Sequence, residues 1–417
     1  MEILTATYLL PIEGDPIPQG AIVIDEDHIL DLGVQSDILP RYCSAKVTDY
    51  PQAVIMPGLV NAHAHLDRST APSIQPDTSY ISWLAEWIRV REDISAVMRR
   101  ESILNGLYES LHHGTTCIGD MGNHTGALEP LLQSKMRLKI FPEFVGSTRE
   151  NAPSQFESTL KILDDISNKN SNRLSAGVAP YSSYMLSKEM LSILARHAAY
   201  HQIPLKIHMA ESFTEMEFFY EAKGEITETL FPSMGWEDAE IPLYRNTPLQ
   251  YIHKIGLMKN APILVGCLHL SNQDLELIKK TSSKIVHCPR NNEFFHLGTP
   301  PLKKWLEAGI PIGLGTEGRD VSSSLSLWDE MRSVVKTHAH NGRSPTPQEI
   351  LSIATWGGAR TLGLDREIGS LARGKKADLI AVSLPEGTDA PQIFSSLIRE
   401  TTQEDIKTVV VDGQTLL

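Results

Sequence analysis

Hydrophobic residues gather in short runs along the central part of the chain, and stretches with helical spacing separate these runs. This alternation is typical of a parallel sheet whose strands are joined by crossover helices. Eight such runs occur, and eight parallel strands close a (β/α)8 barrel. We expect the strands at Gly58–His65, Thr115–Asp120, Leu138–Val145, Ser175–Pro180, Leu205–Ala210, Ile263–Leu270, Lys284–Cys288 and Ile312–Thr316.

The two ends of the chain show short β-type runs separated by Gly, Pro and acidic turns. These runs are Ile3–Leu10, Ala21–Asp25, Ala53–Met56, Ala377–Ser383 and Thr408–Val411. We therefore expect one small β-domain from residues 1–57 and 366–417, and a barrel from residues 58–365. A doubly wound open sheet is the alternative for the central part, but no Gly-rich phosphate fingerprint follows its first strand.

One connection is long for a barrel. Residues 213–246 follow the fifth expected strand and contain many aromatic and acidic side chains. Segments of this length are often lids or contacts between subunits, and we expect one of these two roles here.

Composition and charge limit the kind of partner. The formal net charge of −13 argues against a nucleic-acid-binding surface, which needs clustered Lys and Arg, so a small-molecule partner is expected. The four cysteines show no CxxC pairing and are expected to be reduced core residues: Cys43, Cys117, Cys267 and Cys288. No basic-then-apolar leader opens the chain, and no apolar run approaches the ~20 residues that cross a bilayer, so we expect a cytoplasmic protein without a membrane partner.

Histidines mark the ends of several expected strands. His63 and His65 end the first strand two residues apart and therefore point to one face, while His208 and His269 end the fifth and sixth. The carboxyl ends of barrel strands meet at one mouth, where active sites of this architecture lie. A hydrogen-bonded pair in a loop is the alternative for HxH alone, and a single histidine is more often structural. Four in register favour a metal site.

Two glutamates complete this set. Glu211 follows His208 by three residues, and Glu317 ends the last strand. Imidazoles with a carboxylate suit zinc, and iron second, and an open coordination position allows the metal to lower the pKa of a water toward ~7. Glu211 would carry the proton of that water as general acid and base, and His269 would orient the water. Glu317 would bind the metal or hold the water, the alternative being a helix cap.

At these residues the chain resembles the amidohydrolase superfamily, in the branch of cytosine, guanine and adenosine-type deaminases and triazine hydrolases. The shared motifs are MPGLVNAHAHLD at 56–67, HMAES at 208–212, HLSNQDLELI at 269–278, HCPRNN at 287–292, GLGTEG at 313–318 and IGSLARGKKADLIAVSL at 368–384. The resemblance implies a distorted (β/α)8 barrel, a small β-sandwich built by both termini, and one divalent metal. By position, it implies that the metal ligands are His63, His65, His208 and Glu317, with Glu211 as proton shuttle and His269 near the metal-bound water. It further implies hydrolytic removal of an amino group from a purine-like ring. Relatives often dimerise, so a homodimer is compatible with it.

Three positions depart from the family pattern. Glu317 stands where relatives carry Asp, and its extra methylene displaces the carboxylate by ~1.5 Å unless the backbone retreats. A misplacement on this scale can cost ~100-fold in rate. It is a natural adjustment, an engineered change or a sign of weakened activity. Val178 stands where adenosyl-type deaminases have His, while Tyr181 is kept, and Gly266 also replaces a frequent His.

Among subfamilies the chain is most similar to aminofutalosine deaminases, in TSYISWLAEWIRVRED at 78–93, GTTCIGDMGN at 114–123 and TPLQYIHKIGLM at 247–258. This similarity favours 6-amino-6-deoxyfutalosine, an adenine nucleoside-like intermediate of a menaquinone pathway. The rival substrates are adenosine, S-adenosylhomocysteine, methylthioadenosine, guanine and triazines. A rival of another class is a binding module whose turnover Glu317 has impaired.

The sequence gives weaker evidence for substrate contacts than for metal ligands. The candidates are Tyr181, Arg149, Trp87, Arg290 and Asn291. Trp83 and Trp87 could stack on a purine, but their spacing of four also suits a core-facing helical stripe, which we favour. A surface ion pair is the alternative for Arg149, and a helix cap for Asn291.

Overall fold

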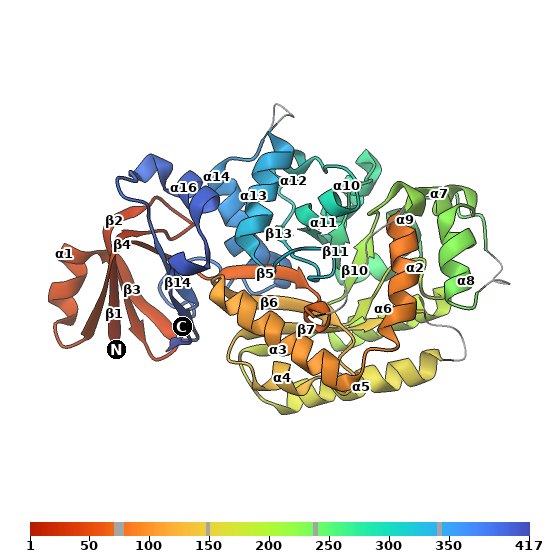
Figure 1. Ribbon diagram of the computed structural model, residues 1–417, viewed down its shortest axis with the longest axis horizontal. Coiled ribbons are helices and arrows are strands. Elements are labelled where there is room, and N and C mark those ends of the chain that lie inside the picture. The colour runs from red at the N-terminus through yellow and green to blue at the C-terminus, as the bar shows by residue number, and fades with distance from the viewer. Residues whose placement is uncertain (71–78, 147–150, 237–240, 340–343) are drawn as a thin grey trace.

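The computed structural model describes residues 1–70, 79–146, 151–236, 241–339 and 344–417, and a barrel of parallel strands lies at its centre (Figure 1). Each of the eight expected runs forms a strand, and the fourth run is divided into two short ones. The barrel strands are β5 (Leu59–Ala64), β6 (Thr115–Gly122), β7 (Arg137–Phe144), β8 (Leu174–Ala176), β9 (Ala179–Pro180), β10 (Lys206–Met209), β11 (Ile263–Gly266), β12 (Lys284–His287) and β13 (Ile312–Leu314).

The barrel closes through two sets of backbone contacts. Strands β5 to β8 and strands β10 to β13 form two parallel sheets. The first strand meets the last where the Thr316 amide donates to the His63 carbonyl at 2.8 Å. The two sheets join on the other side, where Val178 pairs with Leu205. Closure brings the carboxyl ends of all eight strand positions to one mouth.

Helices cover the outside of the barrel, so its strands are buried on both faces and have nearly continuous apolar sequences. Several helices begin at a serine cap; Ser95, Ser187 and Ser271 each accept a bond from the amide three residues later. The helices around the barrel are α2 (Tyr80–Arg91), α3 (Ala96–His112), α4 (Glu129–Gln133), α5 (Ala152–Asn168), α6 (Lys188–His201), α9 (Pro248–Lys254), α10 (Asn272–Thr281), α11 (Pro289–Phe294), α12 (Leu302–Glu307), α13 (Leu327–His338), α14 (Pro347–Ser352) and α15 (Gly358–Leu362).

Lys206 occupies the barrel interior. Its ammonium donates to the carbonyls of Ala62 and Gly119, both at 2.9 Å, and lies 4.2 Å from the centre of the Phe141 ring. Burial lowers the pKa of Lys206 to about 7. The side chain therefore ties β5, β6 and β10 together directly below the mouth.

Both termini build the expected β-domain, as one mixed sheet in the order β16-β15-β14-β4-β1-β2-β3. The sheet curls, because Ile29 of β3 exchanges backbone bonds of 2.8 Å with the segment before β14. A single curled sheet thus encloses the core for which the resemblance implied a sandwich. Its strands are β1 (Glu2–Leu9), β2 (Ile17–Asp25), β3 (His28–Val34), β4 (Lys46–Pro57), β14 (Leu379–Ser383), β15 (Ile406–Val411) and β16 (Gln414–Thr415), with helices α1 (Gln35–Ile38) and α16 (Ile393–Glu400) beside it.

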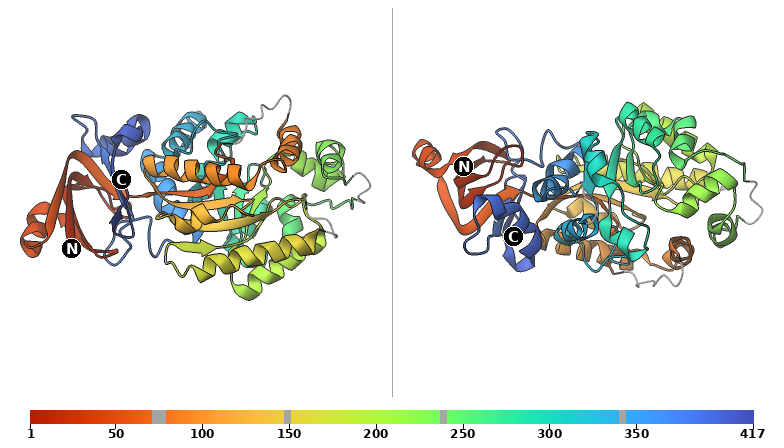
Figure 2. Two further views of the ribbon diagram at one scale, coloured as in Figure 1. Left: turned by 60° about the horizontal axis from the view of Figure 1, so that its bottom comes forward. Right: turned by 90° about the horizontal axis from the view of Figure 1, so that it is seen from above.

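The long connection after β10 lies at the end of the molecule opposite the terminal sheet (Figure 2). It contains α7 (Phe213–Glu221), a π-helical turn at Ile226–Leu230 and α8 (Phe231–Ser233). No described helix is both long and apolar enough to cross a membrane. Cys117, Cys267 and Cys288 are buried as expected, but Cys43 is exposed because it lies in a turn before β4 rather than in a strand.

Candidate metal centre

The first two histidines are fixed at the junction of the first and last barrel strands. His63 is the last residue but one of β5, and His65 directly follows the end of that strand. The Asn61 amide donates to the Thr316 hydroxyl at 2.8 Å, and its oxygen accepts from the His63 amide at 3.2 Å. These bonds lock β5 against β13 and hold both imidazoles toward the mouth.

Three histidines and one carboxylate converge there. One potential ligand atom from each of His63, His65, His208 and Glu317 lies within 4.8 Å of the others. The Glu317 Oε1 is 3.2 Å from His63 Nε2, and its Oε2 is 3.5 Å from His65 Nε2. Ligand atoms around one zinc ion each lie ~2 Å from it, so a modest contraction would enclose a cation. The structure therefore brings together all four expected ligands.

The donor set fits a divalent metal. Both ring nitrogens of His63, the Nε2 atoms of His65 and His208, and Glu317 Oε1 are buried and have no hydrogen-bond partner among the described residues. Buried polar atoms without partners are costly, and one cation would satisfy one nitrogen of each histidine together with the Glu317 oxygen. Burial lowers the pKa of His63 to about 4 and also lowers that of His65, which keeps these imidazoles neutral, the form that ligates metal. Burial also acts to lower the pKa of His208, but Glu211 and Glu317 outweigh it and raise that pKa.

Glu211 lies beside this cluster. Its Oε2 is 3.2 Å from His208 Nδ1 and accepts a hydrogen bond of 3.0 Å from the Tyr80 hydroxyl. A Cβ atom at Gly266, whose φ is +94°, would lie 2.3 Å from Glu211 Cγ. The glycine that departs from the family pattern is thus required by the position of Glu211.

The donors open into a small cavity at the mouth. It is lined by Arg68, Tyr80, Trp83, Tyr181, His208, Glu211, Asn291, Glu317 and Val321. The Tyr181 ring stacks on His208 with 4.8 Å between centroids, and both Tyr181 and Asn291 line this cavity. The sequence reasoning missed Arg68 and Tyr80. Arg68 follows His65 by three residues, and a charged residue directly behind the HxH motif was the available signal.

Three expected site residues have other surroundings. Arg290 does not line the cavity, because its guanidinium binds Glu330 at 2.7 Å and Ser324 at 2.6 Å. Trp87 also lies outside it, since its ring stacks on Trp83 at 6.2 Å and packs beneath Arg68. His269 lies three residues beyond the end of β11, half-buried, with its ring 6.5 Å from the Phe213 ring and outside the cavity lining. Arg149 lies outside the described residues.

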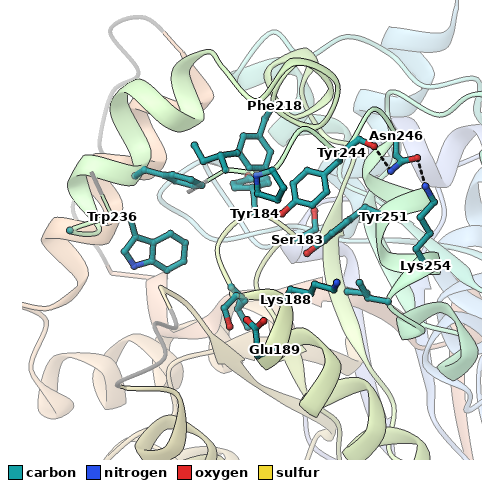
Figure 3. Close-up of a pocket in the computed structure, with 17 residues that line it drawn as sticks. Ser183, Tyr184, Lys188, Glu189, Phe218, Trp236, Tyr244, Asn246, Tyr251 and Lys254 are labelled. Carbon is teal, nitrogen blue, oxygen red and sulfur yellow. Dashed lines mark hydrogen bonds between the residues drawn. The ribbon is translucent and has the colours of Figure 1, made fainter. Parts of the chain in front are cut away.

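A second, larger cavity has a volume of about 860 Å³. Tyr184, Phe218, Tyr244 and Tyr251 form one side of it, and Lys188 and Glu189 lie across from them (Figure 3). Its wall at Ser183 and Tyr184 continues the chain from Tyr181, so the two cavities share one segment. A volume near 860 Å³ is large enough for a drug-sized ligand.

A parallel barrel with this donor set at its mouth defines a metal-dependent hydrolase. The family model described as "Amidohydrolase family" matches residues 54–416, and the chain belongs to this family, as its motifs indicated. It is therefore an enzyme, a hydrolase of the amidohydrolase family.

Three proteins illustrate the relationship. The chain is 28% identical over 419 residues to the 5-methylthioadenosine/S-adenosylhomocysteine deaminase of Moorella thermoacetica, covering 98% of this chain and 92% of the relative. Its fold is similar to a zinc-bound adenosine deaminase from Xanthomonas campestris, with a TM-score of 0.86 at 22% identity over 100% of this chain and 92% of the other. Its fold is also similar to the Helicobacter pylori aminofutalosine deaminase, with a TM-score of 0.86 at 21% identity over 100% of both chains.

Proposed function

We propose that this enzyme is a metal-dependent deaminase of an adenine nucleoside-type substrate, with 6-amino-6-deoxyfutalosine as the particular substrate. The observation that carries the proposal is the buried set of three histidines and Glu317, with Glu211 beside it at 3.2 Å from His208. Zinc is the first candidate for the cation and iron the second, because both accept imidazole and carboxylate ligands. When bound, such an ion supplies the Lewis acidity that activates water at neutral pH.

Glu211 is the proposed proton carrier. It is not one of the four clustered donors, and its carboxylate faces the small cavity. It would accept the proton of the attacking water and deliver it to the departing ammonia, which is general acid and base catalysis. Tyr80 holds the Glu211 Oε2 atom through a hydrogen bond and so fixes the direction of that transfer.

Two features favour a nucleoside with a further substituent over a bare base. One relative is named 5-methylthioadenosine/S-adenosylhomocysteine deaminase, and a structural neighbour is named aminofutalosine deaminase. Neither name refers to a bare base. The small cavity encloses only about 10 Å³, the space of a single water, so a substrate ring must displace part of its lining, whereas the larger cavity of about 860 Å³ begins in the same segment of the chain. The remainder of the substrate would extend toward the aromatic wall.

The test is deamination of a substrate panel by zinc-reconstituted enzyme. Ammonia release and the change in ultraviolet absorbance of the purine are followed with 6-amino-6-deoxyfutalosine, adenosine, methylthioadenosine, S-adenosylhomocysteine, guanine and a triazine. We expect zinc-dependent release with the highest kcat/KM on 6-amino-6-deoxyfutalosine. A higher value on methylthioadenosine or S-adenosylhomocysteine overturns that choice of substrate while keeping the deaminase. The Glu211→Gln variant, loaded equally with zinc, is the matched inactive control.

A non-catalytic binding module is the alternative of another class, based on Glu317 in place of Asp. The left-handed backbone of Glu317, with φ of +56°, accommodates the longer side chain and keeps its carboxylate 3.2 Å from His63. This geometry favours an adjusted ligand over an impaired one. Zinc binding without ammonia release from any member of the panel would support the binding module instead.

A further inference from the structure

Arg68 is a buried cation beside the expected metal ligands. It is 2% exposed and lies in the short turn Leu66–Arg68 directly after the HxH motif. Its Nη1 is 3.3 Å from Asp320 Oδ2, and its Nη2 is 3.6 Å from Glu317 Oε2. Arg68 thus connects the ends of the first and last barrel strands through two carboxylates.

Two neighbouring segments, helix α2 and the loop after β13, hold the guanidinium in place. The rings of Trp87 and Trp83 on α2 lie 5.3 and 6.0 Å from its central carbon, within the range of cation–π contacts. A Cβ atom at Gly318 would lie 2.3 Å from Asp320 Oδ1 and 3.1 Å from Arg68 Cβ. Close approach of Arg68 and Asp320 therefore requires glycine at position 318.

Glu317 needs such a support more than an aspartate would. Its extra methylene adds one rotatable bond between backbone and carboxylate, and a ligand must be held within about 0.5 Å of its productive position. Glu317 also has a left-handed backbone, which residues with a Cβ seldom adopt and which is frequent at functional sites. One carboxylate oxygen faces His63, and the other lies between His65 and Arg68.

We propose that Arg68, anchored by Asp320, is a positioning residue that holds the longer Glu317 carboxylate so that one oxygen is presented to the metal. The inference rests on the metal site of the proposed function. In this view, Arg68 and Asp320 compensate for the longer and more mobile side chain of glutamate at position 317. A shorter aspartate would not reach the guanidinium and would not require it.

The charge of Arg68 alone has the opposite effect, which makes the proposal testable. A guanidinium repels a divalent cation, so a purely electrostatic role predicts that removal of Arg68 strengthens zinc binding. A positioning role predicts that removal weakens it. Arg68→Lys keeps the positive charge but loses the planar fork, and positioning predicts weaker binding for this variant as well.

The experiment measures zinc affinity by competition with a chromophoric chelator. Arg68→Met and Arg68→Lys should bind zinc about 10- to 100-fold more weakly than the unaltered chain, the usual effect of losing a partner that orients a ligand. The double variant Arg68→Met with Asp320→Asn leaves no unpaired charge at this place and should show the same loss. Arg137→Met is the matched control, because it removes another buried arginine ion pair far from the metal ligands and should leave zinc affinity unchanged.

A double-mutant cycle with Glu317→Asp completes the test. In the Glu317→Asp background, Arg68→Met should change zinc affinity by less than about 3-fold, because coupled residues are not additive. Tighter or unchanged binding in Arg68→Met, or full additivity in the cycle, overturns the proposal. A raised KM with unchanged zinc affinity also overturns it, by assigning Arg68 to substrate binding. If the unaltered chain binds no zinc, the proposed function itself fails, which is a distinguishable result.

Discussion

Two buried ionic clusters lie at opposite ends of the barrel and differ in how their polar atoms are paired. Arg137 begins β7 near the terminal sheet, where its guanidinium donates to both oxygens of Asp378 at 2.8 and 3.1 Å, to Asp412 at 3.1 Å and to the Asn172 carbonyl at 3.1 Å. At the mouth, His63 and Glu317 have buried side-chain atoms without a hydrogen-bond partner among the described residues.

This difference in pairing indicates that the Arg137 cluster serves stability and the cluster at the mouth serves function. A fully bonded buried ion pair has nothing left to bind, and it joins the barrel to the terminal sheet. A cluster with several unsatisfied atoms is costly for the folded protein unless a ligand completes it. We therefore expect changes at the mouth to affect metal and turnover, and changes at Arg137 to affect folding.

Metal removal should have the largest effect and act only through the mouth. Chelation of zinc-loaded enzyme should abolish ammonia release and lower the melting temperature, because the ion binds the folded state alone. Readdition of zinc should restore both. His208→Ala should bind zinc at least 100-fold more weakly in the same chelator assay. Full activity after exhaustive chelation would contradict the division between the two clusters.

Glu211→Gln should separate catalysis from metal binding within the mouth. Glutamine keeps the shape of the side chain and can still accept the Tyr80 hydrogen bond, but it cannot carry a proton. We expect kcat to fall about 10²- to 10⁴-fold, the usual contribution of a general acid and base. Zinc affinity should remain within a few-fold. Steady-state kinetics on samples of equal zinc content measure the first quantity, and loss of zinc in this variant would argue that Glu211 is a ligand.

The strands could be predicted because buried parallel strands have continuous apolar sequences. All eight expected positions form strands, with ends that move by a few residues. The largest shift is at β11, which ends at Gly266 because Cys267 has a left-handed backbone with φ of +61°. The apolar run continues to Leu270 and gave no sign of this turn. His269 was consequently expected at a strand end, and it lies in the loop beyond.

The metal ligands could be predicted because strand period and barrel closure determine where they point. The part of the cavity that faces away from the metal ligands could not be predicted in the same way, because it depends on how α2 packs across the mouth. The stripe of Trp83 and Trp87 was interpreted as core-facing, and both rings are buried, at 2% and 4% exposure. The face that α2 buries is the mouth itself, so Trp83 lines the cavity. Arg290 follows a strand as expected, but only the fold shows that Glu330 binds its side chain.

Arg137→Met should test the other cluster. Removal of the arginine leaves Asp378 buried and unpaired, and breaking a buried pair in this way typically costs about 3–5 kcal/mol. We expect the free energy of unfolding in urea to fall by about this amount. At a temperature where the variant is folded, kcat and zinc affinity should match those of the unaltered enzyme. A loss of turnover in the folded variant would show that the two ends of the barrel are coupled.

The smallest expected effect concerns Glu215, which lies behind the metal ligands. Its Oε2 accepts the Glu211 amide at 3.1 Å, and its Oε1 accepts the Ser183 hydroxyl at 3.4 Å. Burial and the neighbouring Glu211 carboxylate raise the pKa of Glu215 to about 8, from about 4.5 in an exposed chain. Between these values the folded state holds a proton that the unfolded state has lost. The free energy of unfolding should therefore decrease as pH rises through this window, by at most about 1.4 kcal/mol per pH unit.

Glu215→Gln removes this titration while retaining groups that can bond to Ser183 and to the Glu211 amide. The variant and the unaltered chain should have similar stability near pH 5, and the variant should become the more stable of the two as pH approaches 8. Urea unfolding at several pH values measures the difference between the two slopes, in which the titration of the shared histidines cancels. Parallel slopes would mean that Glu215 is ionised in the folded protein.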